Sequence, residues 1–347
     1  MPRSSSASSF YRAPLKASAL VLALAAATSA MAAENGNQRY SAGIGGSDMT
    51  TPVVPGLYFQ APMVAYHASK IKGNDGKQLT NFTADPYPRA KVSIDTDTYA
   101  ILPRLTYISS HRLLGAHVGV TAMLPVVKRK ADFGLTTGNG TLDAGLGLAA
   151  RASQMSGSET GIADLEVSPV MHWEIGDHQS VTFAPTIVMP LGDFKADQRV
   201  NTGFGDYYTF RPSVQYAFIG DGWDLGGRAV MSFNTRNKDT GYYSGKIFNF
   251  DWQAMAFVSE DIRVGVQGYF VRQLQADTVN PTPANGMTQK MLVDQQGNKA
   301  SVNAIGPAVA WLMNGGEMLI EGKFIKEFGA KNRTEGQAFW LTISKPL

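Results

Sequence analysis

A two-residue alternation of apolar and polar side chains constrains this fold most, and Tyr207–Phe218 (YYTFRPSVQYAF) is its clearest example. Tyr208, Phe210 and Phe218 share one face of this segment, whereas Arg211 lies on the other face. Such alternation is typical of a β-strand. The segment is longer than the roughly 5–6 residues of a mean strand and reaches the roughly 9–11 residues that cross an outer membrane at a tilt. It therefore suits a membrane-spanning strand with Phe210 and Phe218 toward lipid and Arg211 toward a polar lumen.

The same alternation recurs along the chain and predicts an all-β fold, a transmembrane antiparallel outer-membrane β-barrel of about twelve strands. A closed barrel satisfies every backbone hydrogen bond within the sheet, which allows strands to exist in hydrocarbon. A soluble all-β protein is the alternative. The expected strands lie near 56–69, 96–109, 114–127, 161–175, 179–191, 206–218, 223–234, 242–258, 261–274, 302–313, 316–328 and 335–346.

The connections between these segments favour the membrane barrel. Short turns, as at Gly176–His178 and Asn314–Gly315, alternate with longer loops. Short periplasmic turns and longer outer loops are the layout of an outer-membrane barrel. We expect any selection of solutes by loops to involve residues 70–95, 128–160 and 276–301.

The first residues have the features of a secretory signal peptide. A basic stretch precedes a short apolar run, Ala19–Ala27, and residues 30–32 (AMA) form an A-x-A cleavage site. The mature chain would begin at Ala33 or Glu34. We divide the chain into a signal peptide (1–33), an N-terminal periplasmic segment (34–55) and a transmembrane β-barrel (56–347).

Charge and cysteine content exclude several classes. Three of the 31 Lys and Arg residues lie in the signal peptide, which leaves 28 against 28 Asp and Glu, so the mature chain is formally neutral. We therefore expect no nucleic-acid partner. The chain has no cysteine, which excludes disulfides, a lipidated N-terminal cysteine and cysteine-bound zinc.

Prolines inside the expected strands are the exception to this pattern. Proline cannot donate to the hydrogen-bond ladder and is usually found at bulges or strand ends. Bulges or strand ends are one explanation; a weakened ladder that opens the wall sideways to a hydrophobic solute is the other. The residues are Pro62, Pro103, Pro125, Pro169, Pro185, Pro190, Pro212 and Pro307.

Several short motifs, in this order, resemble the MetA-pathway of phenol degradation family, which includes SphA-like outer-membrane β-barrel proteins. The motifs are Pro55-Gly56-Leu57-Tyr58, Gly161 with Asp164-Leu165, Met189-Pro190-Leu191-Gly192-Asp193-Phe194, Asn234 with Thr240-Gly241-Tyr242, Gly245 with Asp251-Trp252, Gly268-Tyr269, Gln273, Gly306-Pro307 and Glu335-Gly336.

The resemblance implies an outer-membrane channel or facilitator for uptake of small hydrophobic or aromatic compounds. It supplies no catalytic residues. We expect a monomer in the bacterial outer membrane, with outer-membrane lipid and a small hydrophobic or aromatic solute as its partners and no cofactor.

Charged and histidine side chains on the expected inner faces are the candidate lumen-lining and selectivity residues. They could form a polar path that screens solutes by size and charge, or a structural network that fills a narrow barrel and pairs its own charges. The residues are Arg104, His117, Asp164, Glu166, His172, Arg211, Asp224, Arg228, Asp251, Arg263, Glu321 and Lys323.

Other functions find less support in the sequence. A barrel enzyme acting on lipid would need a Ser–His site on the outer wall, yet no G-x-S-x-G motif is present. The outer loops lack the repeats of a structural or adhesive barrel. Asp95 and Asp97 could hold calcium at a loop end, but two carboxylates fall far short of the six oxygens it needs, so we expect no metal site. The Gly145-Leu-Gly147 stretch could form a short helix or a plug in its outer loop.

Overall fold

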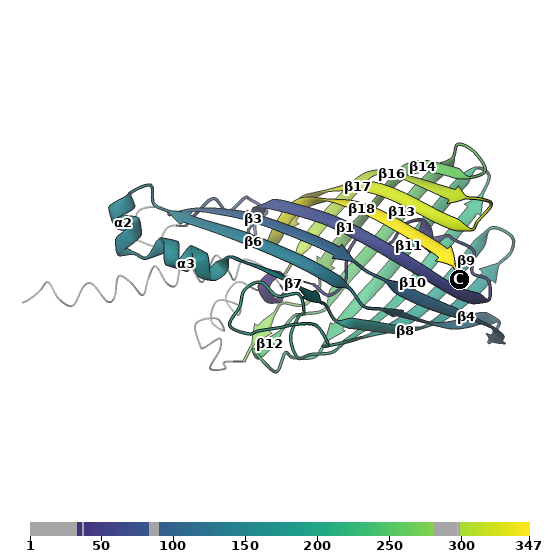
Figure 1. Ribbon diagram of the computed structural model, residues 1–347, viewed down its shortest axis with the longest axis horizontal. Helices are drawn as coiled ribbons and strands as arrows, with labels where there is room; N and C mark the ends of the chain where they lie inside the picture. The colour runs from purple at the N-terminus through teal and green to yellow at the C-terminus, as the bar shows by residue number, and fades with distance from the viewer. Residues whose placement is uncertain (1–32, 37, 83–89, 281–296, 298) are drawn as a thin grey trace, which may run out of the picture.

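The computed structural model describes residues 33–36, 38–82, 90–280, 297 and 299–347. They form a closed antiparallel barrel that crosses from end to end twelve times (Figure 1), as the sequence predicted. The last strand, β18 (Arg333–Pro346), pairs with the first, β1 (Gly56–Lys72), and this pairing closes the wall. Among the described residues no helix is long and apolar enough to cross a membrane.

Most crossings are made by one continuous strand, while three are made by two strands in succession. The continuous ones are β1, β9 (Gln179–Met189), β10 (Thr209–Gly220), β11 (Trp223–Asn234), β13 (Ile247–Phe257), β14 (Ile262–Gln273), β16 (Ser301–Met313), β17 (Met318–Lys331) and β18. The divided ones are β3 (Ala90–Ile101) with β4 (Arg104–Leu113), β5 (Ala116–Met123) with β6 (Val126–Thr136), and β7 (Gly157–Ile162) with β8 (Leu165–Ile175).

Short elements lie in the long loops. Helices α2 (Gly140–Gly145) and α3 (Leu148–Met155) lie at the far end of the long arm that β3 and β6 form beyond the barrel (Figure 1), so the expected short helix is present there. Strand β2 (Asn81–Phe82) pairs with β3, and β12 (Tyr242–Tyr243) pairs with β15 (Thr278–Val279). Two 3-10 helices, η1 (Glu34–Gly36) and η2 (Ser47–Met49), precede β1.

The alternation along β10 has the two faces that the sequence predicted. Phe210 and Val214 point outward and are about half exposed, while Arg211 is buried inside. Exposed apolar side chains repeat on neighbouring strands, and they give the barrel an apolar outer surface suited to hydrocarbon. The fold is that of a bacterial outer-membrane barrel.

Two of the expected long loops are shorter than predicted because their strands extend further. Strand β3 begins at Ala90 and β6 continues to Thr136, so much of 70–95 and 128–160 is strand. These extensions reach beyond the barrel (Figure 1), where neither face needs to be apolar and the alternation weakens. Most of the third loop, residues 281–296, lies outside the described residues.

Three neighbouring crossings break at the same level of the wall. The breaks fall at 102–103, 124–125 and 163–164. One backbone hydrogen bond crosses the wall at each break, from Leu102 to Pro62, from Leu124 to Pro103 and from Ala163 to Pro125. Proline has no N–H to continue the ladder, which explains why two of these strands end there.

The expected strand prolines therefore divide into two groups. Pro103 and Pro125 lie at the breaks and Pro190 follows β9, so the strand-end explanation is right for these three. The others sit within strands, and Pro185 of β9 lies directly opposite Pro212 of β10, where neither can donate. Those prolines in the strand interiors are Pro62, Pro169, Pro185, Pro212 and Pro307.

The wall is also incomplete beside β7. In the described part of the chain β7 pairs only with β6, while the next crossing, β9, pairs with β8. The loop that follows β9 bonds to the unpaired edge instead. Asp193 N and Thr202 Oγ1 both donate to Ile162 O, at 3.2 and 3.0 Å. We call residues 190–205 the edge loop.

The segment before β1 lies inside the barrel, which corrects the expected periplasmic location of 34–55. Its backbone bonds to inward-facing strand residues, with Gly43 N donating to Asp251 Oδ1 (3.0 Å) and Ser47 N to Glu321 Oε2 (2.7 Å). At the long-loop end, Ala33 N donates to Asp277 Oδ2 (2.8 Å). Residues 33–55 thus run through the lumen, and we call them the plug. Their charged partners on the wall explain why they fold inward.

Candidate functional site

The candidate site is the lumen of the barrel together with the plug. All twelve side chains expected to face the lumen belong to its interior. Nine are buried, and Arg104, Glu166 and Arg228 are partly buried at the edge of a cavity. The sequence placed these side chains on the inner face but did not identify what they contact.

Three ion pairs link arginines and aspartates of the plug and the wall. Asp48 of the plug lies between Arg104 and Arg228, with Oδ2 at 3.3 and 3.0 Å from their guanidinium nitrogens. Near the outer end, Arg39 of the plug pairs with Asp164 at 2.8 Å, and both side chains are almost fully buried. Buried charges are costly unless paired, so these contacts hold the plug in one position.

Two more pairs form within the wall itself. Arg211 of β10 contacts Glu166 of β8, and Arg263 of β14 contacts Asp224 of β11. The Arg211 guanidinium also donates to Arg39 O of the plug (3.3 Å). Arg211 therefore contacts the same plug residue, Arg39, that pairs with Asp164.

Two lumen carboxylates receive the plug backbone. Asp251 accepts hydrogen bonds from Tyr40 Oη (2.7 Å), Gly43 N (3.0 Å) and Gly45 N (2.9 Å). Glu321 accepts one from Ser47 N. Asp251 thus receives three hydrogen bonds from the plug, while Glu321 also accepts one from Gln267 Nε2 (2.8 Å), so both buried carboxylates have partners.

Lys323 completes this contact with the plug. Its ammonium donates to Gly45 O at 2.6 Å and to Gln267 Oε1 at 2.8 Å, and it lies 3.5 Å from Glu321. The lysine therefore links β17 and β14, which lie on either side of β16, to the plug.

The two lumen histidines lie opposite each other on β5 and β8. His117 Nε2 is 2.7 Å from an Arg112 nitrogen, and His172 Nδ1 is 2.8 Å from Thr182 Oγ1. Among the described residues, neither ring forms a hydrogen bond with the plug or with a serine.

Sequence reasoning missed the plug side of this site, namely Arg39, Tyr40, Asp48 and the glycines of 43–46. The available signal was the glycine spacing in SAGIGGSDMT, because glycine permits close approach of a backbone. A Cβ at Gly46 would lie 2.1 Å from Glu321 Oε1, and one at Gly45 would lie 3.0 Å from Asp251 Oδ2.

Two cavities lie beside the plug, each of about 220 Å³. The inner cavity extends past Arg104, Met123 and Val230 toward the short-turn end of the barrel. The outer cavity is bordered by Tyr269 and by the edge loop. Ser41 of the plug lines both cavities.

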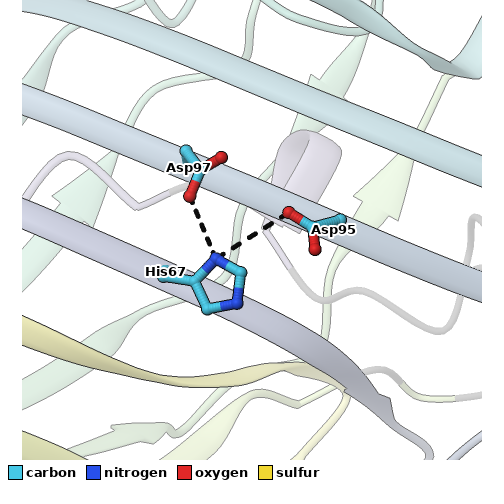
Figure 2. Close-up of side chains that lie close together, drawn as sticks. All are labelled: His67, Asp95 and Asp97. Carbon is cyan, nitrogen blue, oxygen red and sulfur yellow. Dashed lines mark hydrogen bonds and ion pairs between the residues drawn. The ribbon is translucent and has the colours of Figure 1, made fainter.

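A separate polar cluster lies on the outer surface, away from the lumen. Figure 2 shows His67 of β1 beside Asp95 and Asp97 of β3, with Nδ1 3.0 Å from Asp97 and 3.8 Å from Asp95. The two aspartates lie within a strand and not at the loop end that the sequence suggested. The three ligand atoms lie within 4.8 Å of one another, but all three side chains are partly exposed, and hydrogen bonding accounts for their approach.

The family model described as "Putative MetA-pathway of phenol degradation" matches residues 70–343. The chain belongs to this family. The match confirms the resemblance of the short motifs, and it spans nearly the whole barrel. No curated protein matches the chain.

Solved structures agree with the barrel of this MetA-pathway family member. The COG4313 outer membrane channel from Pseudomonas putida F1 aligns with a TM-score of 0.64 at 9% identity, over 87% of this chain and 99% of that one. At this identity the likeness concerns the fold. The CymD monoaromatic hydrocarbon channel (TM-score 0.39, 11% identity, 88% and 93% covered) and a TodX monoaromatic hydrocarbon channel mutant (0.41, 9%, 85% and 91%) are more distant.

Proposed function

We propose that this protein is a monomeric outer-membrane channel through which small hydrophobic or aromatic compounds enter the cell. Membership in a phenol-degradation family and the barrel fold support this function. The observation that carries the proposal is the pair of cavities that are both lined by Ser41. They provide places for a solute on both sides of one plug residue.

The size of the cavities suits a single aromatic ring. An apolar cavity of about 150 Å³ is known to bind benzene, whereas pockets for drug-sized ligands start at roughly 300 Å³. Each cavity here, at about 220 Å³, lies between these values. We infer that the solute has one ring and few substituents.

The walls of the inner cavity suit a ring that carries a hydroxyl group. Ile108, Met123 and Val230 supply apolar surface, and Thr121 and Ser168 supply hydroxyls. A phenol-like solute could pack its ring on the first group and hydrogen-bond with the second. The charged side chains that line this cavity all form ion pairs, Arg104 and Arg228 with Asp48, and Arg211 with Glu166.

Replacing Ser41 tests the proposed path. Ser41→Trp places a bulky ring beside both cavities, and we expect it to reduce uptake of phenol into proteoliposomes to the level of empty vesicles. The matched control is Leu105→Trp, because Leu105 points outward and is about half exposed. Unchanged phenol uptake in a correctly folded Ser41→Trp variant would contradict the proposed path.

The exit from the outer cavity is a second part of the proposal. The edge loop covers the unpaired side of β7, and its residues Val200 and Asn201 line the outer cavity. Arg129 of β6 donates to Asn201 O at 2.9 Å and holds the loop against the wall. We infer that outward movement of this loop opens a side route for a hydrophobic solute.

A further inference from the structure

Asp277 is a buried carboxylate at the outer end of the plug, in the segment between β14 and β15. It is 1% exposed and accepts four hydrogen bonds. The donors are Ala33 N (2.8 Å), Tyr242 Oη (2.8 Å), Gly245 N (2.8 Å) and Gln273 Nε2 (2.5 Å). All four are neutral groups in a continuous chain.

The charge of this carboxylate lacks a cation. Within the described residues no lysine, arginine or histidine forms an ion pair with Asp277, and burial raises the pKa of its carboxyl group. Burying a carboxylate without a positive partner is unfavourable. In the described part of the chain the site thus offers hydrogen bonds to the Asp277 carboxylate but no ion pair.

Ala33 is the one donor whose chemistry changes when the protein matures. Its φ is +61°, in the left-handed region that is unfavourable for alanine. That angle exists only while a peptide bond joins Ala33 to residue 32. Hydrolysis of the bond removes the constraint and converts the neutral N–H into an ammonium.

We propose that the signal peptide is cleaved between Ala32 and Ala33, and that the new α-ammonium of Ala33 pairs with Asp277 to anchor the plug. Water is consumed in the hydrolysis, the carboxylate leaves on Ala32, and the ammonium stays on Ala33. Ala33 is 3% exposed, so this charge lies inside the protein beside Asp277. An α-amino group is largely protonated at neutral pH.

This proposal distinguishes between the two starts that the cleavage motif permits. A chain that begins at Glu34 loses the donor to Asp277, because Glu34 N points instead to Ser244 Oγ at 3.3 Å. A chain with this start would leave the Asp277 carboxylate buried without the Ala33 ammonium. The structure therefore favours Ala33, which also matches the A-x-A motif at 30–32.

The first test is the N-terminal sequence of the protein purified from outer membranes. We expect it to begin with Ala33. A start at Glu34, or retention of residue 32, would overturn the proposal.

The second test asks whether the ammonium anchors the plug. Ile44→Cys places a single thiol on the plug at a buried position, in a chain that has no other cysteine. One glycine inserted between Ala32 and Ala33 moves the ammonium away but leaves an amide at Ala33. We expect maleimide to label the cysteine at least about tenfold faster, the factor that corresponds to ~1.4 kcal/mol.

Two further variants complete this test. Asp277→Asn should accelerate labelling to a similar degree, and combining it with the glycine insertion should add little, because both remove the same ion pair. Asp261→Asn, in an exposed turn, is the control for loss of one charge. An insertion variant that begins with the added glycine yet labels at the unmodified rate would contradict the anchor.

Discussion

Gly46 shows at the scale of one residue why the plug contains glycine where it contacts the wall. Its backbone is extended (φ −163°), so any residue could adopt the angle, and only space requires glycine. A Cβ there would overlap the carboxylate of Glu321, which accepts a hydrogen bond from Ser47 N. The Glu321 side chain thus binds the plug backbone and also leaves no room for a side chain at position 46.

Gly46→Ala should therefore loosen the plug. The added methyl group must displace the Glu321 carboxylate or the plug backbone, and overpacking of this kind costs about 1–3 kcal/mol. We expect a loss of that size in the free energy of unfolding by urea in detergent. Gly140→Ala is the matched control, because nothing lies within 4 Å of a Cβ at that position. Equal effects of the two substitutions would contradict the steric account.

At the scale of elements, the broken strands explain where the wall can change shape. Strands β3, β6 and β7 lie on the outer side of the three breaks. The edge loop, not another strand, bonds to β7 on its remaining side. The proposed side route therefore lies where a loop takes the place of a neighbouring strand.

A disulfide between β7 and the edge loop tests that movement. A Cβ at Gly161 would lie 3.3 Å from Asp193 Cγ, which is compatible with disulfide geometry for the pair Gly161→Cys and Asp193→Cys. We expect the oxidised protein to take up little phenol and the reduced protein to recover. Each single-cysteine variant should be insensitive to reductant. Equal uptake before and after reduction of the double variant would exclude the side route.

At the scale of the whole molecule, the barrel was predictable and its contents were not. Alternation such as that of β10 depends on local side-chain order, so strand number and lumen-facing residues followed from the sequence. The plug contacts join residues far apart in the chain, such as Tyr40 with Asp251, and no local pattern encodes them. The breaks at Pro103 and Pro125 were predictable only in part. The sequence shows the prolines, but it does not show that they lie at the same level on neighbouring strands.

The plug is the feature on which this account of transport depends. Within the described residues the plug forms ion pairs with Arg104, Arg228 and Asp164 of the wall. Without it, these groups would face water in a wider pore. Ion flow should therefore report directly on whether the plug is in place.

The most direct measurement is single-channel conductance in a planar bilayer, for the mature protein and for a variant in which Ala33 is joined to Pro55. We expect the mature protein to show small or no steady conductance and the plug-less variant to show large, stable steps. Folding of both should first be verified by heat-dependent mobility on gels. Steps of equal size in the two proteins would contradict a plugged lumen, and so would a folded plug-less variant that does not conduct.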